Sequence, residues 1–154
     1  MWFSWLLLFS LMGNGGAASY STASAAVAAV PQWDLDGVSL GDTESEVIAA
    51  WGKPNAVETD EWHPDCVIWS YMGGRNAGLC DGEVSFVQVT SRADKVNLNG
   101  RELAMSGPDL RRALGNPEFE AEDGWGVIHG PEALKVFVDE RGKLVSLDLF
   151  GSEF

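Results

Sequence analysis

The chain has 154 residues, of which 45% are hydrophobic and 21% are charged, an ordinary composition for a globular protein. The formal net charge is −13 at pH 7, and no Asp, Glu, Lys or Arg precedes Asp34. An acidic surface is repelled by nucleic acid and by anionic membranes, which excludes nucleic-acid binding and favours either simple solubility or a basic partner.

The first 33 residues differ from the rest of the chain. An apolar run from Trp2 to Met12 is followed by small residues from Gly13 to Ala18, which is the pattern of a signal peptide. We expect residues 1–25 to be a signal peptide or an N-terminal anchor, and residues 26–33 to be a linker. The run is shorter than the roughly 20 residues of a membrane span. The expected location is therefore extracytoplasmic, either secreted or periplasmic, and the alternative is membrane anchoring through an uncleaved N-terminal segment.

Two segments that align without a gap follow, Ser39–Pro54 and Glu102–Pro117. Thr43 and Ser106 occupy the positions of helix N-caps, where a hydroxyl accepts hydrogen bonds from free backbone N–H groups. Glu46 is spaced to complete a capping box. Each segment ends in Gly-x-Pro, which stops a helix. We predict one short helix in each segment.

Strand patterns follow each predicted helix and predict the fold class. Alternating or β-branched and aromatic runs occur at Cys66–Tyr71, Glu83–Thr90, Trp125–His129, Leu134–Val138 and Val145–Leu149. We predict an α+β repeat of two tandem units, 34–91 and 96–154, each a short helix packed on an antiparallel β-sheet. The linker between the units is Ser91–Asp94.

The first helix motif, Leu40-Gly41-Asp-Thr43 with Val47 and then Gly52-Lys-Pro54, is similar to the opening of BamE/SmpA-type outer-membrane assembly modules. The tandem arrangement resembles the β-lactamase-inhibitory-protein fold more closely. As architecture the resemblance covers most of residues 34–154, and as sequence it covers only the helix-opening motifs. It implies a module that binds other proteins and does no chemistry.

The sequence departs from that family in three places. Asp42 replaces the usual Met, the second unit has no Cys, and the Met72–Leu79 loop carries Arg75 but no carboxylate. The inhibitory mechanism of the family is therefore not implied for this chain.

Cys66 and Cys80 are the two cysteines, and in an exported chain we expect them to form a disulfide. A loop of about 15 residues closed in this way stabilises a fold by about 3 kcal/mol. Free thiols are one alternative. A zinc site with His63 and either Asp65 or Asp81 is another, although the spacing matches no common zinc pattern.

No catalytic signature stands out. The sequence contains no Gly-x-Ser-x-Gly motif, phosphate-binding glycine loop or calcium-loop motif. We expect no enzymatic activity, catalytic residue, metal or cofactor. A hydrolase that uses an unrecognised carboxylate pair is the alternative, because acidic residues are numerous.

The seven tryptophans are the least ordinary feature of the composition. Trp51 belongs to the apolar stripe of the first predicted helix, whereas Trp62 and Trp125 each follow an acidic loop. Aromatic anchors on a sheet are typical of protein interfaces. We predict an exported, non-catalytic module that binds another protein, or alternatively a cell-envelope accessory protein anchored by its N-terminal segment. The predicted binding face consists of Trp62, Tyr71, Arg75, Trp125 and His129.

Overall fold

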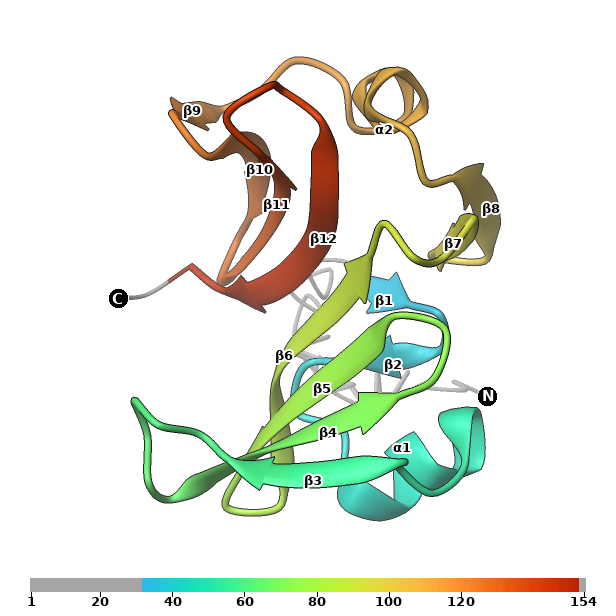
Figure 1. Cartoon of the computed structure of the whole chain (residues 1–154), viewed down its shortest axis with the longest axis vertical. Coiled ribbons are helices and arrows are strands. Elements are labelled where there is room, and N and C mark those ends of the chain that lie inside the picture. Colours follow the sequence, from blue (N-terminus) through green and yellow to red (C-terminus); the bar gives the residue numbers. More distant parts are fainter. Residues whose placement is uncertain (1–31, 153–154) are drawn as a thin grey trace, which may run out of the picture.

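The computed structural model describes residues 32–152, so the predicted signal peptide or anchor and most of the predicted linker lie outside the described residues. The described part contains two helices and twelve strands (Figure 1). In chain order the elements are β1 (Asp34–Leu35), β2 (Val38–Ser39), α1 (Glu44–Trp51), β3 (Ala56–Thr59), β4 (Cys66–Tyr71), β5 (Arg75–Cys80), β6 (Glu83–Thr90), β7 (Lys95–Leu98), β8 (Arg101–Ala104), α2 (Gly107–Leu114), β9 (Phe119–Ala121), β10 (Gly124–His129), β11 (Glu132–Val138) and β12 (Leu144–Gly151).

The strands form two antiparallel sheets. The small sheet has the order β2-β1-β7-β8, and the large sheet has the order β3-β4-β5-β6-β12-β11-β10-β9. Strands from the two halves of the chain meet in the middle of each sheet, where β1 pairs with β7 and β6 pairs with β12. The β6–β12 register runs from Phe86 opposite Phe150 to Thr90 opposite Ser146. We call this strand pair the seam.

The prediction of an α+β fold made of two tandem helix-on-sheet units is wrong. The protein is mostly antiparallel β-sheet, and each half of the chain contributes strands to both sheets. Two separate sheets would leave β6 and β12 as edges with unpaired backbone groups, and pairing them satisfies those groups. The helices are minor elements of eight residues, in which only Val47 of α1 and Leu110 of α2 are buried.

The local helix predictions are confirmed. The Thr43 hydroxyl accepts from the Glu46 N–H at 3.3 Å, and the Glu46 carboxylate accepts from the Thr43 N–H at 2.8 Å. The Ser106 hydroxyl accepts from the Asp109 N–H at 3.2 Å at the start of α2. Gly52 and Gly115 end the helices with φ of 80° and 79°, a region that favours glycine. Neither helix within residues 32–152 is long and apolar enough to cross a membrane.

All five predicted strands are confirmed, and the three in the second half of the chain lie within β10, β11 and β12. The predicted strands Cys66–Tyr71 and Glu83–Thr90 are β4 and β6. The segment Met72–Leu79, expected to be a loop, instead contains most of β5, which pairs with both of those strands. Pairing on both sides outweighs the weak strand preference of its Gly, Asn and Ala residues.

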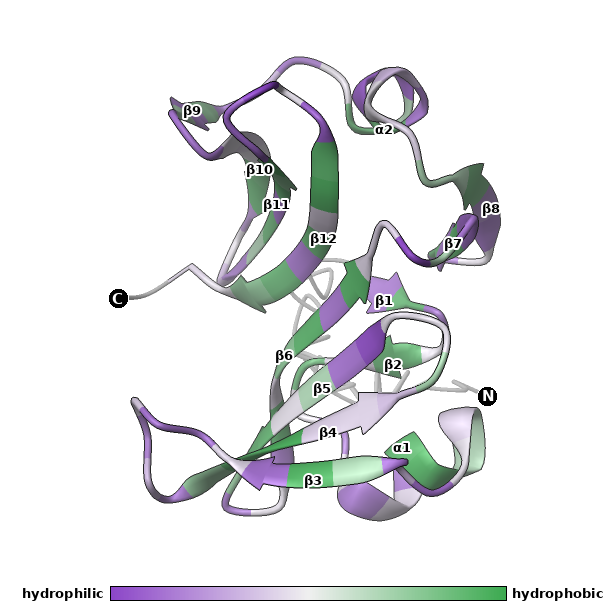
Figure 2. Ribbon diagram, in the orientation of Figure 1, coloured by the Kyte–Doolittle hydropathy of each residue, from purple (hydrophilic) through white to green (hydrophobic). Residues whose placement is uncertain are grey.

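The hydrophobic core lies between the two sheets. Leu35 and Val38 of the small sheet are completely buried, as are Val87 and Leu147 of the large sheet. The small sheet and both helices lie on one side of the large sheet (Figure 1). In β12, hydrophilic residues (purple) alternate with hydrophobic ones (green), as expected for a strand with one face in the core (Figure 2). The opposite face of the large sheet carries the candidate site.

Candidate functional site

The large sheet has an open groove of about 1060 Å³ on the face opposite the core. Because successive side chains of a strand point to opposite faces, the burial of Val87 in the core directs Phe86 and Gln88 into the groove. Seven of the eight strands contribute to its lining, and the loop between β3 and β4 adds Trp62. Five of its lining side chains are aromatic: Trp62, Phe86, Phe119, Phe137 and Phe150.

Two of the aromatic rings lie over strand glycines. Phe86 is opposite Gly78 in the β5–β6 pair, and Phe119 is opposite Gly126 in the β9–β10 pair. A Cβ atom on either glycine would collide with the ring opposite it. A cross-strand aromatic ring commonly covers the gap that a strand glycine leaves. The two glycines therefore set the positions of two rings that line the groove.

A row of polar side chains crosses the groove floor between the aromatic rings. Asn76, Gln88, Asp148 and Lys135 are neighbours in register across β5, β6, β12 and β11. Asn76 Nδ2 donates to Gln88 Oε1 at 2.8 Å, and Gln88 Nε2 donates to Asp148 Oδ2 at 3.0 Å. The Ser146 hydroxyl donates to Asp148 Oδ1 at 2.6 Å. The row thus places a hydrogen-bonded carboxylate on the seam.

The Lys135 ammonium group, at the end of this row, has partners beyond it. Its Nζ atom forms an ion pair with Asp123 Oδ1 at 2.8 Å and lies 4.3 Å from the centroid of the Phe137 ring. The Lys135 side chain is largely buried, whereas the Asp123 side chain is exposed. Lys135 is therefore already engaged by a carboxylate at the end of the groove.

The two carboxyl groups near Lys135 have opposite pKa shifts. Burial raises the pKa of Asp148 above its ordinary value, and its hydrogen bonds to Ser146 and Gln88, with the charge of Lys135, offset only part of this shift. The hydrogen bond from Lys135 lowers the pKa of Asp123. A carboxyl group with a raised pKa in a cleft marks a candidate functional residue. Residues 32–152 contain no group of three or more His, Cys, Asp and Glu side chains placed to hold a metal ion.

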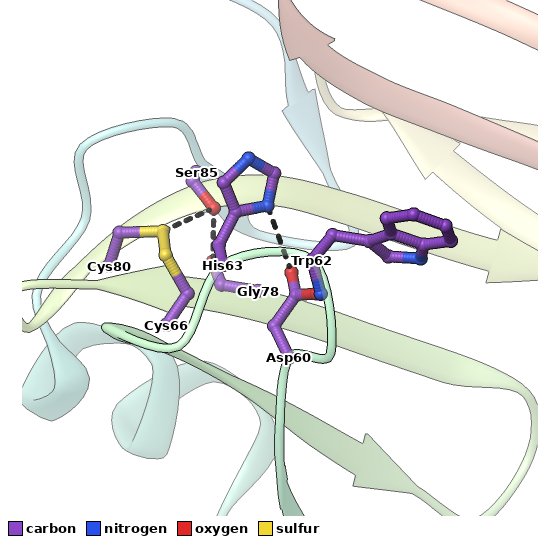
Figure 3. Close-up of a disulfide and its surroundings, with 7 residues drawn as sticks. All are labelled: Asp60, Trp62, His63, Cys66, Gly78, Cys80 and Ser85. Carbon is purple, nitrogen blue, oxygen red and sulfur yellow. Dashed lines mark hydrogen bonds and ion pairs between the residues drawn. A yellow bond between two sulfur atoms is a disulfide. The ribbon is translucent and has the colours of Figure 1, made fainter.

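The predicted disulfide is confirmed: Cys66 and Cys80 are bonded and stand opposite each other in β4 and β5, with their Cα atoms 4.2 Å apart. The loop that carries Trp62 runs from Asp60 to Asp65 and ends at Cys66 of this bond (Figure 3). Asp60 organises the loop, since its carboxylate accepts from the Trp62 N–H at 2.9 Å and lies 3.5 Å from His63 Nδ1. The backbone hydrogen bond from Trp62 is the main cause that lowers the pKa of Asp60.

The predicted site residue Trp62 lines the groove and is 87% exposed. Tyr71 and Arg75 lie on the other face of the sheet. Tyr71 contacts the end of α1, and Arg75 contacts the segment that precedes α1. The Tyr71 hydroxyl donates to the Gly52 carbonyl at 2.9 Å, and its ring meets the Trp51 ring edge-on at 5.2 Å. Arg75 Nε forms an ion pair with Asp36 at 2.9 Å.

Trp125 and His129 also lie on the core side of the large sheet. Trp125 is opposite the buried Val136, and the Arg111 guanidinium of α2 stacks over its ring at 4.9 Å. The His129 ring packs edge-on against Trp33 at 4.9 Å. The structure therefore does not bring the five predicted binding residues together, because only Trp62 faces the groove.

Sequence reasoning missed most of the residues that form the groove, including Phe86, Phe119, Lys135 and Asp148. One usable signal exists in β12. Asp148 and Phe150 lie on the face of β12 that points away from the core. Simple alternation predicts a polar, solvent-exposed face there, but Phe150 is aromatic. A large aromatic side chain on the face opposite the core indicates that this face is apolar as well.

No family model matches the sequence, and no curated protein matches it. Among solved structures, the chain is similar to an extracellular protein containing an SCP domain from Bacillus anthracis, with TM-score 0.54 and 14% identity over 74% of this chain and 44% of that chain. It is also similar to a cysteine-rich secretory protein from Staphylococcus aureus, with TM-score 0.52, 14% identity and the same coverages of 74% and 44%. A DUF4309 family protein from Bacillus subtilis matches with TM-score 0.45 and 16% identity over 72% of this chain and 79% of that chain.

These likenesses correct the predicted family. The chain spans less than half the length of the first two structures, and at 14% identity the likeness concerns the fold alone. The first two similar structures are a protein containing an SCP domain and a cysteine-rich secretory protein, so the predicted resemblance to BamE/SmpA-type modules and to the β-lactamase-inhibitory-protein fold is wrong.

Proposed function

We propose that the protein is an exported, non-catalytic binding module whose groove holds an apolar segment of another protein. The observation that carries this proposal is the open groove lined by five aromatic side chains. Aromatic residues, Phe included, are enriched at protein interfaces, and the groove volume of about 1060 Å³ is at the upper end for small-molecule pockets. An extended segment with apolar side chains fits a long open groove better than a compact ligand does.

Export is supported by two features of the chain. The Cys66–Cys80 disulfide is a type of bond that persists in oxidising compartments outside the cytosol. The apolar run from Trp2 to Met12 has the character of a signal peptide. The first two similar structures are described as an extracellular protein and a secretory protein, which agrees with this location.

The arrangement of charges supports binding rather than hydrolysis. A carboxylate-pair hydrolase needs two carboxyl groups that both reach the substrate. Asp148 lines the groove, but Asp123 is tied to Lys135 at 2.8 Å. Asp148 is thus the one carboxyl group among the described residues that line the groove.

Two matched isoleucine variants test the proposal. Ile128 lines the groove and is 41% exposed, whereas Ile48 lies on α1, outside the groove lining, and is 39% exposed. Random heptapeptides displayed on phage are selected on the purified full-length chain, and the selected peptides are then titrated against Ile128→Glu and Ile48→Glu. We expect Ile128→Glu to weaken binding at least tenfold and Ile48→Glu to leave it unchanged. Equal binding by the two variants, both confirmed as folded by circular dichroism, would show that the groove is not the binding site.

A further inference from the structure

Building on the proposed function, we propose that the bound segment carries one basic side chain among apolar ones, and that Asp148 receives it. The partner segment is apolar and carries a single ammonium group near its centre. Three features of the groove support this: the free acceptor capacity of Asp148, the charge balance of the lining and the aromatic rings around the carboxylate.

Asp148 has acceptor capacity left on the groove floor. An ionised carboxylate accepts up to about four hydrogen bonds. The side chains of Ser146 and Gln88 supply short bonds at 2.6 and 3.0 Å, one to each oxygen, and Gln88 adds a longer contact of 3.4 Å. These partners approach from β12 itself and from the neighbouring strand β6. The side of the carboxylate that lines the groove is the direction from which a ligand would donate.

The charges at the groove do not balance within the protein. Asp148 and Lys135 are the two charged residues in the lining, and Lys135 is paired with Asp123. With all three groups ionised, two negative charges and one positive charge leave a net charge of −1. Asp148 is half-buried, and charges at such a site are screened less by water, so an arriving cation gains more here than at an exposed site. The formal net charge of −13 on the whole chain also attracts a basic segment.

The surroundings suit an ammonium group on a long apolar stem. Phe150 is next to Asp148 on the same face of β12, and Phe86 is opposite Phe150 across the seam. Aromatic rings attract cations through their faces, and the contact of Lys135 with Phe137 already provides one such pair in the groove. The methylene groups of a lysine would pack on the rings while its ammonium group reaches Asp148.

The test compares matched peptides on matched proteins. A groove-binding heptapeptide selected as above is synthesised with a central lysine, or with norleucine, its neutral and nearly isosteric replacement. Each peptide is titrated by isothermal calorimetry against the full-length chain and against Asp148→Asn. We expect the norleucine peptide to bind the unmodified chain at least about tenfold more weakly than the lysine peptide does. The two peptides should bind the Asp148→Asn variant equally well. If the change from lysine to norleucine lowers the affinity equally for both proteins, the assignment of Asp148 is overturned.

A second measurement needs no variant. The charged groups that face Asp148 are Lys135 of β11 and, beyond it, Asp123, while β6 contributes the neutral Gln88. We expect binding of the lysine peptide to weaken as the pH falls and Asp148 gains its proton, and binding of the norleucine peptide to change little. Parallel pH profiles for the two peptides would contradict the proposal.

The outcomes separate this inference from the function on which it rests. In one outcome, the selected peptides are apolar, show no preference for a basic residue and fail to bind the Ile128→Glu variant. That outcome would overturn the role of Asp148 and leave the groove as the binding site. Selected peptides that bind Ile128→Glu as tightly as the unmodified chain would overturn both proposals.

Discussion

Gln88 and Asp148 stand directly opposite each other on β6 and β12, and the Gln88 amide donates to the Asp148 carboxylate at 3.0 Å. The two strands come from different halves of the chain and form the seam of the large sheet. The half-buried carboxylate of the groove is therefore held by both halves together. Neither half alone would provide both of its hydrogen-bond partners, because Ser146 is on β12 and Gln88 is on β6.

Asp148 should make the protein less stable as the pH rises, whereas an ordinary ion-paired carboxylate makes a protein less stable as the pH falls. Burial raises its pKa in the folded state, so the folded protein holds this proton more tightly than the unfolded chain does. The contribution to stability is fully present below the unfolded pKa and is lost as the pH rises through the folded pKa. We expect Asp148→Asn to raise the melting temperature at pH 7 and to bring no comparable gain at pH 3.

Thermal unfolding followed by circular dichroism from pH 3 to pH 8 checks this expectation. Asp123→Asn is the contrasting variant, because the ion pair with Lys135 lowers the pKa of Asp123 and its contribution is lost only as the pH falls. A stabilisation by Asp148→Asn that does not depend on pH would contradict the account.

Gly78→Ala should destabilise the protein, because a Cβ atom at this position collides with the Phe86 ring. Overpacking of this kind typically costs about 1–3 kcal/mol. The measurement is the free energy of unfolding in urea. In a Phe86→Ala background the same change should cost much less, since the ring is gone.

Gly107→Ala is the control for the glycine change. Gly107 begins α2, and a Cβ atom there meets no neighbour within 4 Å. We expect this substitution to be neutral or stabilising by up to about 1 kcal/mol. Similar effects for Gly78→Ala and Gly107→Ala would show that the ring does not pack on Gly78.

Loss of the Cys66–Cys80 disulfide should lower the free energy of unfolding by about 3 kcal/mol, because the bond closes a loop of about 15 residues and so restricts the unfolded chain. Urea unfolding of the Cys66→Ala, Cys80→Ala double variant measures the effect. Dithiothreitol should lower the urea midpoint of the unmodified chain and leave the double variant unchanged. A midpoint that does not respond to reductant would contradict this prediction.

Alanine substitutions at two tryptophans should have different consequences. Trp62 is 87% exposed and lines the groove, so Trp62→Ala should weaken peptide binding and leave the melting temperature almost unchanged. Trp125 is half-buried beneath Arg111, so Trp125→Ala should cost about 1–3 kcal/mol of stability. Thermal melting and peptide titration of both variants separate the two effects, and a folded Trp62→Ala variant with undiminished binding would count against the groove.

The sequence predicted the features that depend on local chemistry. The hydroxyls of Thr43 and Ser106, with the glycines that end each helix, predicted α1 and α2 within one residue at their starts. The disulfide followed from two cysteines in an exported chain. The strands β4 and β6 followed from runs of β-branched and aromatic residues.

Features that depend on long-range pairing were missed. β5 contains Gly, Asn and Ala and becomes a strand because β4 and β6 pair with both of its edges. The pairing of β6 with β12 joins residues about sixty positions apart, and no local pattern encodes it. The groove was missed for the same reason, because Asn76, Gln88, Asp148 and Lys135 become neighbours only when four strands align.

Amide chemical shifts measured by NMR during titration with a selected peptide test the central claim most directly. If the groove binds the peptide, the largest shifts should fall on Phe86, Gln88, Ile128 and Asp148, and those of α1 and α2 should stay small. Shifts concentrated on the helices or on the small sheet would contradict the account.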